Sequence, residues 1–203
     1  AERTESFLSD CHGRDHVTHA ELAVSNDGTF LGFKNETIAN LGAYASVFGT
    51  VTPTYLFGPC ATGVYKMPAA YSNVKAVFTN TAPVDAYRGA GRPEATYTIE
   101  RLVEKAAVEL GMDKTEIRMK NFPTEFPFQQ TLVHSVDSGD YVAGMNKAKE
   151  MADYEGFEKR REESEAKGKL RGIGVTTYFE ACGIAPSAVV MSLGCGIGLW
   201  ESA

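Results

Sequence analysis

Apolar and polar residues alternate along the first third of the chain, which is the pattern of half-buried β-strands. Residues 17–24 and residues 29–39 both alternate, and the sequence Asn-Asp-Gly at 26–28 lies between them. An Asn-Asp-Gly turn between two alternating runs is typical of a β-hairpin. A further strand is predicted at residues 70–78. We therefore expect a small β-sheet in this part of the chain.

The period of the apolar residues becomes helical after residue 92. One apolar face, with spacings of i, i+3, i+4, i+7, i+8 and i+11, predicts a helix over residues 93–110. Its members are Ile99, Leu102, Val103, Ala106, Ala107 and Leu110. Pro93 suits the first turn of this helix, and Gly111 suits the position just after its end. Asp113 is then predicted to cap a second, shorter helix that ends near Asn121.

Two long runs carry no charged side chain, namely residues 37–65 and residues 181–200. Both contain proline and several glycines, which do not suit a membrane-spanning helix. We expect both runs to be irregular backbone that is buried only against parts of a longer protein outside this sequence. The isolated chain is therefore expected to expose large apolar patches.

The last third of the chain is predicted to follow a boundary. Residues 123–138 are rich in Phe, Pro and Gln and lack periodicity, so we interpret them as a linker. Residues 140–167 are predicted to be helical, with charges of both signs that indicate a solvated surface. Residues 170–179 are predicted to form a buried strand. Together these elements predict an α+β fold, a mixed α/β class in which sheets pack against helices.

Charge and composition limit the functions that this chain can have. It has 203 residues, a net charge of −6 and no basic cluster. Nucleic acids and anionic membranes both attract positive charge, so neither is an expected partner. The sequence starts with charged residues and lacks the apolar region of a signal peptide. We expect a cytoplasmic protein whose sequence here begins and ends within a longer chain.

The sequence does not predict a metal site built from Cys or His side chains. Its four cysteines lie far apart, without a Cys-x-x-Cys pair, which disfavours zinc and iron–sulfur ligation; they are Cys11, Cys60, Cys182 and Cys195. His12, His16 and His19 are spaced as on a metal-binding helix face, but their segment is predicted to enter a strand. Cys182 lacks a neighbouring base, which favours an inert thiol.

Residues 85–95 have the features of a binding site. Gly89 and Gly91 run directly into the N-terminus of the predicted helix. Glycines let backbone N–H groups approach a ligand, and the helix start adds partial positive charge, which together suit an anion or a metal–oxo group. Arg88 and Arg92 flank the glycines and add charge. The alternative is that the glycines only begin the helix, because the third glycine of a dinucleotide-binding Gly-x-Gly-x-x-Gly motif is absent.

A long part of the chain resembles a known family. Residues 84–122, VDAYRGAGRPEATYTIERLVEKAAVELGMDKTEIRMKNF, resemble the large, molybdopterin-binding subunit of the xanthine dehydrogenase and aerobic carbon-monoxide dehydrogenase family, the molybdenum hydroxylases. The resemblance extends to five further segments, which are Arg3–Phe7, His12–His16, Asn40–Tyr44, Tyr65–Pro68 and Gly172–Glu180. It therefore covers essentially the whole chain.

The resemblance implies a domain division and an activity. Residues 1–122 would be the end of a first molybdopterin-binding domain, residues 123–138 a linker, and residues 139–203 the truncated start of a second. The implied enzyme hydroxylates a carbon centre, or oxidises carbon monoxide, at a molybdenum–molybdopterin cytosine dinucleotide. Water supplies the oxygen atom. Electrons leave through iron–sulfur clusters and FAD on partner subunits, and the expected assembly is a dimer of heterotrimers.

The same resemblance assigns the candidate site residues. Residues 86–92 would form the active-site loop beside molybdenum, where Arg88 is the main catalytic candidate and contacts the metal's oxo or sulfido group largely through its backbone. Glu180, at the end of a predicted strand, is a second catalytic candidate, although a structural role for it is favoured. The predicted cofactor-binding residues are Tyr87, Arg88, Gly89, Ala90, Gly91 and Arg92. No residue of the chain is predicted to ligate the metal.

The chain departs from the family at two positions that bear on the substrate, and it lacks three of the family's motifs. Carbon-monoxide dehydrogenases have a copper-binding cysteine where this chain has Gly89, and glycine offers no soft sulfur donor for Cu(I). Purine-oxidising relatives have an aromatic residue where this chain has Ala90. The family's upstream Gly-Gly-Phe-Gly loop, its Gly-Gln-Gly pterin-binding stretch and its catalytic glutamate are all absent. The expected substrate is therefore an aldehyde or an N-heterocycle. The alternatives are true carbon-monoxide oxidation, and a non-catalytic assembly domain whose glycine loop only begins a helix.

Overall fold

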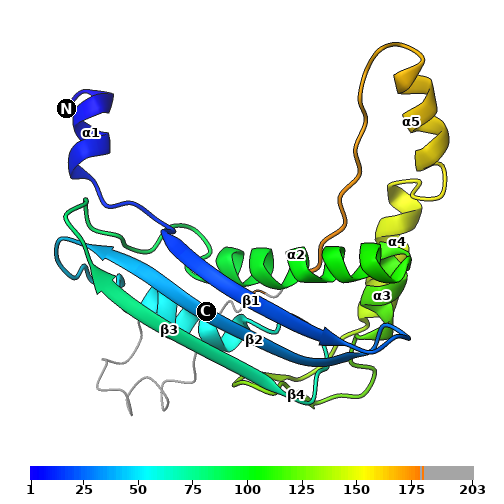
Figure 1. The fold of residues 1–203 in the computed structure, drawn as a ribbon, viewed down its shortest axis with the longest axis horizontal. Helices are drawn as coiled ribbons and strands as arrows, with labels where there is room; N and C mark the ends of the chain where they lie inside the picture. Colours follow the sequence, from blue (N-terminus) through cyan, green and yellow to red (C-terminus); the bar gives the residue numbers. More distant parts are fainter. Residues whose placement is uncertain (179, 181–203) are drawn as a thin grey trace.

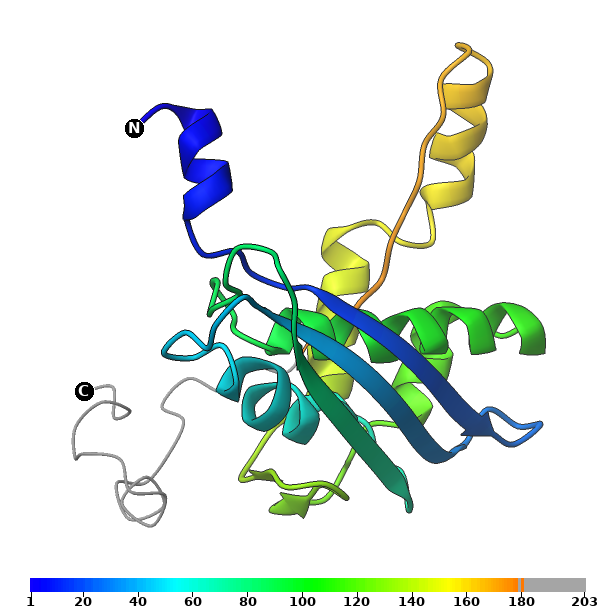
Figure 2. The same ribbon diagram turned by 60° about the vertical axis from the view of Figure 1, so that its left-hand side comes forward.

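The computed structural model of the chain describes residues 1–178 and residue 180. It has a mixed α+β architecture, in which one face of a small sheet is covered by helices (Figures 1 and 2). In chain order the elements are α1 (Arg3–Ser9), β1 (His16–Val24), β2 (Phe30–Gly42), the helical turns η1 (Thr52–Leu56) and η2 (Gly58–Cys60), β3 (Ala70–Phe78), α2 (Arg92–Leu110), α3 (Lys114–Lys120), β4 (Phe128–Gln129), β5 (Ser135–Val136), α4 (Tyr141–Met151) and α5 (Phe157–Glu165).

The main sheet has the strand order β1-β2-β3. β1 and β2 form the predicted antiparallel hairpin, and Gly28, with φ +85°, supplies the left-handed residue of its turn. β3 spans the predicted residues and pairs with β2 in parallel, in a register that joins Phe33 to Ala70. Parallel pairing requires the chain to cross from one end of the sheet to the other. The long connection between β2 and β3 makes this crossing.

Helix α2 covers one face of the sheet and begins the main core. Its residues Ile99 and Val103 are fully buried against Phe30 and Phe33 of β2. The helix ends, as predicted, at Gly111, which has a left-handed backbone with φ +64°. The capping prediction for α3 is also confirmed, because the Asp113 carboxylate accepts hydrogen bonds from the N–H groups of Thr115 and Glu116. Local periodicity and caps thus place both helices correctly.

The connection between β2 and β3 corrects the expectation for the uncharged run 37–65. Residues 52–65 fold into η1, η2 and a following turn that pack beside α2 under the same face of the sheet (Figure 2). Phe57 and Cys60 are buried against Ala95 of α2, and Tyr65 is buried in the main core. This run is therefore buried largely by the chain itself, because its apolar side chains fill the space beside α2. The run 181–200 lies outside the described residues.

The predicted linker, residues 123–138, packs onto the core instead of standing apart from it. It contains the short antiparallel pair β4–β5. The Gln130 side chain is buried and donates a hydrogen bond to the Gly63 carbonyl, and Leu132 packs against the main core. The division of the chain into two domains stays a prediction.

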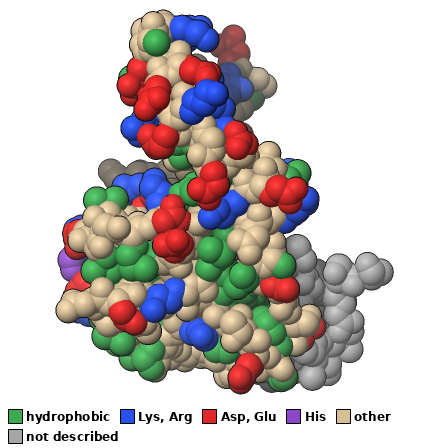
Figure 3. Space-filling model, turned by 90° about the vertical axis from the view of Figure 1, so that its right-hand side faces the viewer, with side chains coloured by type: hydrophobic (Ala, Val, Ile, Leu, Met, Phe, Trp, Pro, Cys, Tyr) green, Lys and Arg blue, Asp and Glu red, His purple; other side chains and the backbone are tan. Residues whose placement is uncertain are grey.

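The charged segment 140–167 is helical, as predicted, and it consists of two helices. α4 and α5 are separated at Asp153, which has φ +46° and cannot continue a right-handed helix. The Tyr154 hydroxyl donates to the Asp113 carboxylate across 2.8 Å, which holds this break against the start of α3. Helices α4 and α5 form an arm that protrudes from the rest of the chain (Figure 1). Figure 3 shows acidic and basic side chains interleaved over this arm, as the charge pattern predicts.

The predicted buried strand at 170–179 is also wrong for its described residues. Residues 170–178 return along the arm without regular secondary structure, and Leu170 is 96% exposed. Within this segment half-buried and exposed residues alternate, and Thr177 forms hydrogen bonds with buried groups of the core. The Thr177 side chain therefore holds residues 170–178 against the core, although this segment pairs with no strand in the described part of the chain. In the described part of the chain, no helix is long and apolar enough to cross a membrane.

Candidate active-site loop

The predicted loop 86–92 follows residues 83–85, which are joined to the N-terminal part of the chain by backbone hydrogen bonds. His12 N–H donates to the Pro83 carbonyl at 2.9 Å, and Asp85 N–H donates to the His12 carbonyl at 2.8 Å. The Asp85 carboxylate in turn accepts a hydrogen bond from Phe48 N–H at 3.0 Å. Residues 12–14 therefore lie directly beside the start of the loop, although the two segments are distant in sequence.

The loop consists of two consecutive tight turns. Ala90 N–H donates to the Tyr87 carbonyl at 2.7 Å, and Arg92 N–H donates to the Gly89 carbonyl at 3.1 Å. Gly89, Ala90 and Gly91 all have positive φ, of 94°, 38° and 92°. Side chains disfavour this left-handed backbone, so the two glycines are the residue type that the turns require.

Gly91 is also required by packing. A Cβ atom at this position would lie 2.7 Å from the backbone nitrogen of Phe57 and 2.8 Å from the carbonyl oxygen of Thr52. A Cβ atom on Gly89 would instead meet the ring of Pro93, with Cγ at 2.6 Å. The chain itself therefore explains both glycines, whether or not a ligand approaches them.

The start of α2 is not an open anion site. Pro93 has no N–H, and the Arg92 N–H is used within the loop. Glu94 folds back so that its carboxylate accepts a hydrogen bond from Gly91 N–H at 3.1 Å. This carboxylate already occupies the position that the helix start offers to an anion.

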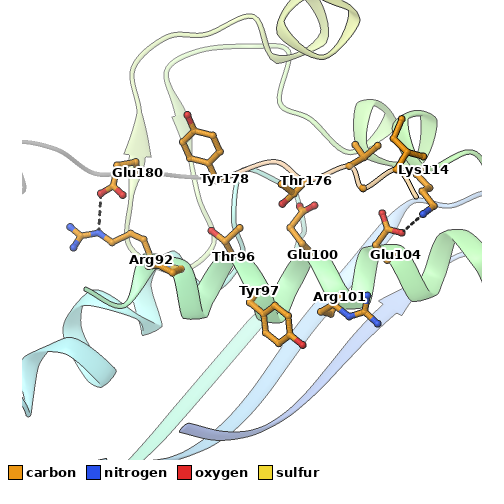
Figure 4. Close-up of a pocket in the computed structure, with 14 residues that line it drawn as sticks. Arg92, Thr96, Tyr97, Glu100, Arg101, Glu104, Lys114, Thr176, Tyr178 and Glu180 are labelled. Atoms are coloured by element: carbon orange, nitrogen blue, oxygen red, sulfur yellow. Dashed lines mark ion pairs between the residues drawn. The ribbon is translucent and has the colours of Figure 1, made fainter. Parts of the chain in front are cut away.

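Arg92, predicted as a cofactor-binding residue, turns inward beneath the loop. It is buried, and its Nη1 donates to the Ala90 carbonyl at 3.2 Å. Its Nε lies 3.6 Å from the carboxylate of Glu180, the second catalytic candidate (Figure 4). The structure thus brings these two predicted residues together as an ion pair behind the loop.

Tyr87 and Arg88 lie on the outer side of the loop. Both residues are exposed, and the Arg88 side chain makes no hydrogen bond or ion pair with any described residue. The Arg88 carbonyl, in contrast, accepts a hydrogen bond from Arg14 Nη2. Arg14 also stacks on the Tyr87 ring, with 4.9 Å between the guanidinium carbon and the ring centroid. Sequence reasoning missed Arg14, because no local pattern links it to the loop.

Two grooves lie on either side of the N-terminal half of α2. The first groove has a volume of about 640 Å³, and its lining includes Thr96, Glu100, Thr176, Tyr178 and Glu180. Figure 4 shows Thr96 and Glu100 pointing toward Thr176 and Tyr178, while Tyr97 and Arg101 point away from them. The second groove, of about 810 Å³, lies between α2 and β1 and is lined by residues that include Arg14, His16, Glu94, Thr98 and Arg101.

The second groove contains buried polar atoms whose hydrogen-bonding capacity is unused. His16 Nδ1 and Glu94 Oε1 are both buried without a hydrogen-bond partner in the described part of the chain. Burial lowers the pKa of the His16 imidazole, although the neighbouring Glu94 opposes this effect. Buried polar atoms are normally paired, so these two atoms have hydrogen-bonding capacity left for a bound molecule or water.

A buried ion network occupies the other end of α2. Glu100 accepts a hydrogen bond from Arg118 Nε at 2.9 Å and from the Thr177 hydroxyl at 2.8 Å. Tyr65 also donates to Glu100, and Arg118 Nη2 binds Glu104 at 3.0 Å. Burial and the neighbouring Glu100 raise the pKa of the Tyr65 hydroxyl well above its usual range. Every charge in this network is paired, which indicates a structural role.

The structure also joins a cysteine and a histidine that the sequence keeps far apart. Cys60 Sγ lies 3.5 Å from His134 Nε2. Burial raises the pKa of the Cys60 thiol to about 11, against the opposing effect of Arg92. At neutral pH the thiol is protonated, so it is not a reactive nucleophile.

The three histidines considered at the sequence level do not converge. His16 is half-buried and packs edge-on against Phe57, whereas His19, on the other face of β1, is exposed and pairs with Glu21. His12 forms a hydrogen bond with the Phe7 carbonyl. Across the described residues, no group of three or more His, Cys, Asp or Glu side chains is placed to hold a metal ion.

Comparison with known proteins decides the family. Residues 1–122 match the family described as the molybdopterin cofactor-binding domain. The chain belongs to this family of molybdenum hydroxylase large subunits. It is 37% identical to the carbon monoxide dehydrogenase large chain of Hydrogenophaga pseudoflava, over 99% of this chain and 26% of that protein. It is 35% identical to the 6-hydroxypseudooxynicotine dehydrogenase complex subunit gamma of Paenarthrobacter nicotinovorans, over 90% of this chain and 24% of that protein.

Solved structures of this family have the same fold. Quinoline 2-oxidoreductase from Pseudomonas putida 86 matches 96% of this chain and 25% of its own, with a TM-score of 0.86 and 34% identity. Reconstituted CO dehydrogenase from Oligotropha carboxidovorans matches 93% of this chain and 25% of its own, with a TM-score of 0.81 and 32% identity. The chain therefore spans about a quarter of the length of the relatives that it matches.

The loop and its neighbour Arg14 carry hydrogen-bond donors that could face a bound molybdenum–pterin group. The Arg88 guanidinium has no acceptor among the described residues, and Arg14 Nε, beside the same loop, is buried without a hydrogen-bond partner in the described part of the chain. Hydrogen-bond donors of this kind suit oxygen or sulfur atoms that carry negative charge. The residues present thus fit such a group.

Proposed function

We propose that the full-length protein is the catalytic subunit of a molybdenum hydroxylase that oxidises a carbon centre of an aldehyde or an N-heterocycle. A bound molybdenum–molybdopterin cytosine dinucleotide would supply the transfer of a water-derived oxygen atom and the acceptance of two electrons. These electrons pass to iron–sulfur clusters and FAD on partner subunits. The relatives that are named as subunits of dehydrogenase complexes support such partners. We place the assembly in the cytoplasm, as a dimer of heterotrimers.

The observation that carries this proposal is that some hydrogen-bond donors of the loop are left unused by the described residues. Ala90 and Gly91 use their N–H groups within the turns, whereas the Gly89 N–H and the Arg88 side chain have no partner in the described structure. In this proposal both are donors for the oxygen or sulfur atoms of the molybdenum group or of the substrate. Such preorganised donors stabilise negative charge that develops during a reaction.

The other predicted residues take supporting roles in this proposal. Tyr87, Ala90 and Gly91 shape the turns, and Arg92 supports the loop from below through its hydrogen bond to Ala90. Glu180 is proposed as a groove residue whose carboxylate is partly neutralised by Arg92. The ion pair with Arg92 engages the Glu180 carboxylate, so we assign the role of general base to the glutamate expected elsewhere in the full-length protein.

Carbon-monoxide oxidation is the second candidate, and the similarity to carbon monoxide dehydrogenase large chains favours it. One solved relative is described as a Cu,Mo-CO dehydrogenase. This chain has Gly89 where copper would need a thiolate, and a Cβ atom there would lie 2.6 Å from the Pro93 ring. We therefore propose that the site holds molybdenum without copper.

The test is to express the full-length reading frame together with its neighbouring subunits and to measure metals and turnover. We expect molybdenum and pterin in near-equal amounts, copper well below the molybdenum content, and oxidation of an aldehyde or an N-heterocycle. A complex that lacks molybdenum would overturn the proposed function. One copper per molybdenum together with carbon-monoxide oxidation would favour the second candidate.

A further inference from the structure

Three consecutive carbonyl groups of the loop are hydrogen-bonded by arginine side chains. Arg14 Nη2 donates to the Arg88 carbonyl. Arg92 Nη1 donates to the carbonyls of Gly89 and Ala90, at 3.5 Å and 3.2 Å. A trans peptide is planar, and its C=O and N–H groups point in opposite directions. Fixing these carbonyls therefore fixes the directions of the three N–H groups that follow them.

Two of these three N–H groups are already used by the loop. Ala90 N–H binds the Tyr87 carbonyl at 2.7 Å, and Gly91 N–H binds the Glu94 carboxylate at 3.1 Å. Gly89 N–H has no hydrogen-bond partner among the residues that the structure describes. Gly89 is only half-buried, so a ligand can reach it. The peptide between Arg88 and Gly89, whose carbonyl Arg14 holds, thus carries the donor that is left for a ligand.

Arg14 is itself held in place by its surroundings. Its Nε lies 3.4 Å from Glu94 Oε2, and its guanidinium packs over the Tyr87 ring. Its backbone has φ +60°, a left-handed conformation that is uncommon for a residue with a side chain. Such strain persists only where the surrounding structure over-determines it, and it tends to occur at functional sites.

The segment that carries Arg14 is fitted closely to the loop. A Cβ atom on Gly13 would lie 2.5 Å from Tyr87 Cβ, so only glycine allows the two backbones to approach this closely. The parallel bridge between His12 and Val84 fixes the register of the two segments. These contacts aim the Arg14 guanidinium at one peptide of the loop.

We propose that Arg14 is a positioning residue for the active-site loop, which fixes the Arg88–Gly89 peptide so that the Gly89 N–H is a preorganised donor to the bound group or substrate. This inference rests on the proposed function, because it takes the loop to lie beside the reacting atoms. Arg14 acts through the loop backbone and does not touch the substrate.

The test uses the full-length subunit in its assembled complex, with two variants and a matched control. Arg14→Ala removes the guanidinium. Arg14→Lys keeps a positive charge beside Glu94 but lacks the fork that reaches Glu94 and the Arg88 carbonyl together. Arg161→Ala is the control, since this arginine lies on α5 and pairs only with residues of its own helix in the described structure. Each complex is measured for molybdenum content, melting temperature, kcat and KM.

We expect Arg14→Ala and Arg14→Lys to keep their molybdenum and melting temperature while kcat falls about 10- to 100-fold. This is less than the roughly 10²- to 10³-fold loss for deleting such a donor outright, because the N–H remains but is no longer fixed. KM should change much less than kcat, because the lost interaction acts mainly in the transition state. Guanidinium added to Arg14→Ala should restore part of kcat. Amide hydrogen exchange of residues 86–92 should become faster in both Arg14 variants and stay unchanged in Arg161→Ala.

Wild-type kcat in either Arg14 variant would overturn the proposal. The proposal would also be overturned if kcat fell in parallel with molybdenum content or melting temperature and guanidinium did not restore it. That combination is expected if Arg14 has only a structural role. If Arg14→Ala fails to assemble, Arg14→Lys decides. A wild-type complex without molybdenum or hydroxylation would instead refute the proposed function, and the exchange rates of the loop would still test what Arg14 does to it.

Discussion

The two ends of helix α2 use arginine and glutamate in opposite ways. Near its C-terminal half, Arg118 is fully buried, and its guanidinium is paired with Glu100, Glu104 and the Lys114 carbonyl. Before its N-terminus, the Arg88 side chain is exposed and unpaired within the described structure, while its backbone is held firmly by Arg14. Complete pairing is typical of a structural network, whereas a rigid backbone with unused donors is typical of a binding site.

The largest expected effect concerns the buried network. Arg118→Met removes the guanidinium and leaves the buried carboxylate of Glu100 without a cation. Breaking a buried pair in this way costs about 3–5 kcal/mol. Urea unfolding of the full-length subunit should show this loss, and Arg101→Met, at an exposed position on α2, should change stability by less than about 0.5 kcal/mol. A loss below about 1 kcal/mol for Arg118→Met would mean that the network is not structural.

The next effect is the loss of stability on replacing either of two glycines that have a left-handed backbone. It separates the cost of packing from the cost of backbone strain. Gly91→Ala places a Cβ atom 2.7 Å from the backbone of Phe57, whereas the same change at Gly111 meets no atom within 4 Å. Gly111→Ala should therefore cost about 1 kcal/mol for the left-handed backbone alone. Gly91→Ala should cost about 2–4 kcal/mol, because overpacking adds to the strain. Equal losses in urea unfolding would show that the loop does not pack against residues 52–57 as described.

A third prediction tests whether the exposed Arg88 side chain serves the reaction, in contrast to the structural Arg118. Arg88→Ala should leave the melting temperature unchanged, because the side chain has no partner in the described structure. Turnover should fall about 100-fold if the guanidinium stabilises charge on the bound group or the substrate. Steady-state kinetics and molybdenum analysis of the complex measure both quantities. Unchanged turnover would favour the alternative in which the glycine loop only begins a helix.

The smallest effect concerns the cap of α3. Although burial alone would raise it, the hydrogen bonds from Thr115, Tyr154 and Glu116 lower the pKa of Asp113 to about 2. The pKa in the unfolded chain is about 3.9, so the ionised carboxylate stabilises the fold above about pH 4 and loses this effect as the pH falls toward 2.

Asp113→Asn should therefore reduce the acid sensitivity of unfolding. At pH 7 it should cost only about 1 kcal/mol, because solvent screens the charge at this partly exposed site and Asn is also a good N-cap. Acid titrations of both proteins, followed by circular dichroism, would measure this. An identical acid transition in the two proteins would contradict the pairing described for Asp113.

The sequence by itself determined the elements whose signals are local. The hairpin, strand β3, helix α2 and the caps at Gly111 and Asp113 follow from side-chain period and from residues that satisfy backbone groups within a few positions. The family was also readable from the sequence, because the residues around the loop are contiguous. The roles assigned to the residues of the loop and to Glu180 stay predictions.

Only the tertiary structure decided what depends on contacts between distant segments. The burial of residues 52–65, the break at Asp153 and the pairing of Cys60 with His134 have no local signature. The same holds for Arg14, which acts on a loop far along the chain. Side-chain period reports which face of an element is buried, but not which distant residue will lie against it. Those pairings are set by how the elements pack together, and the packing is where the loop acquires its fixed backbone.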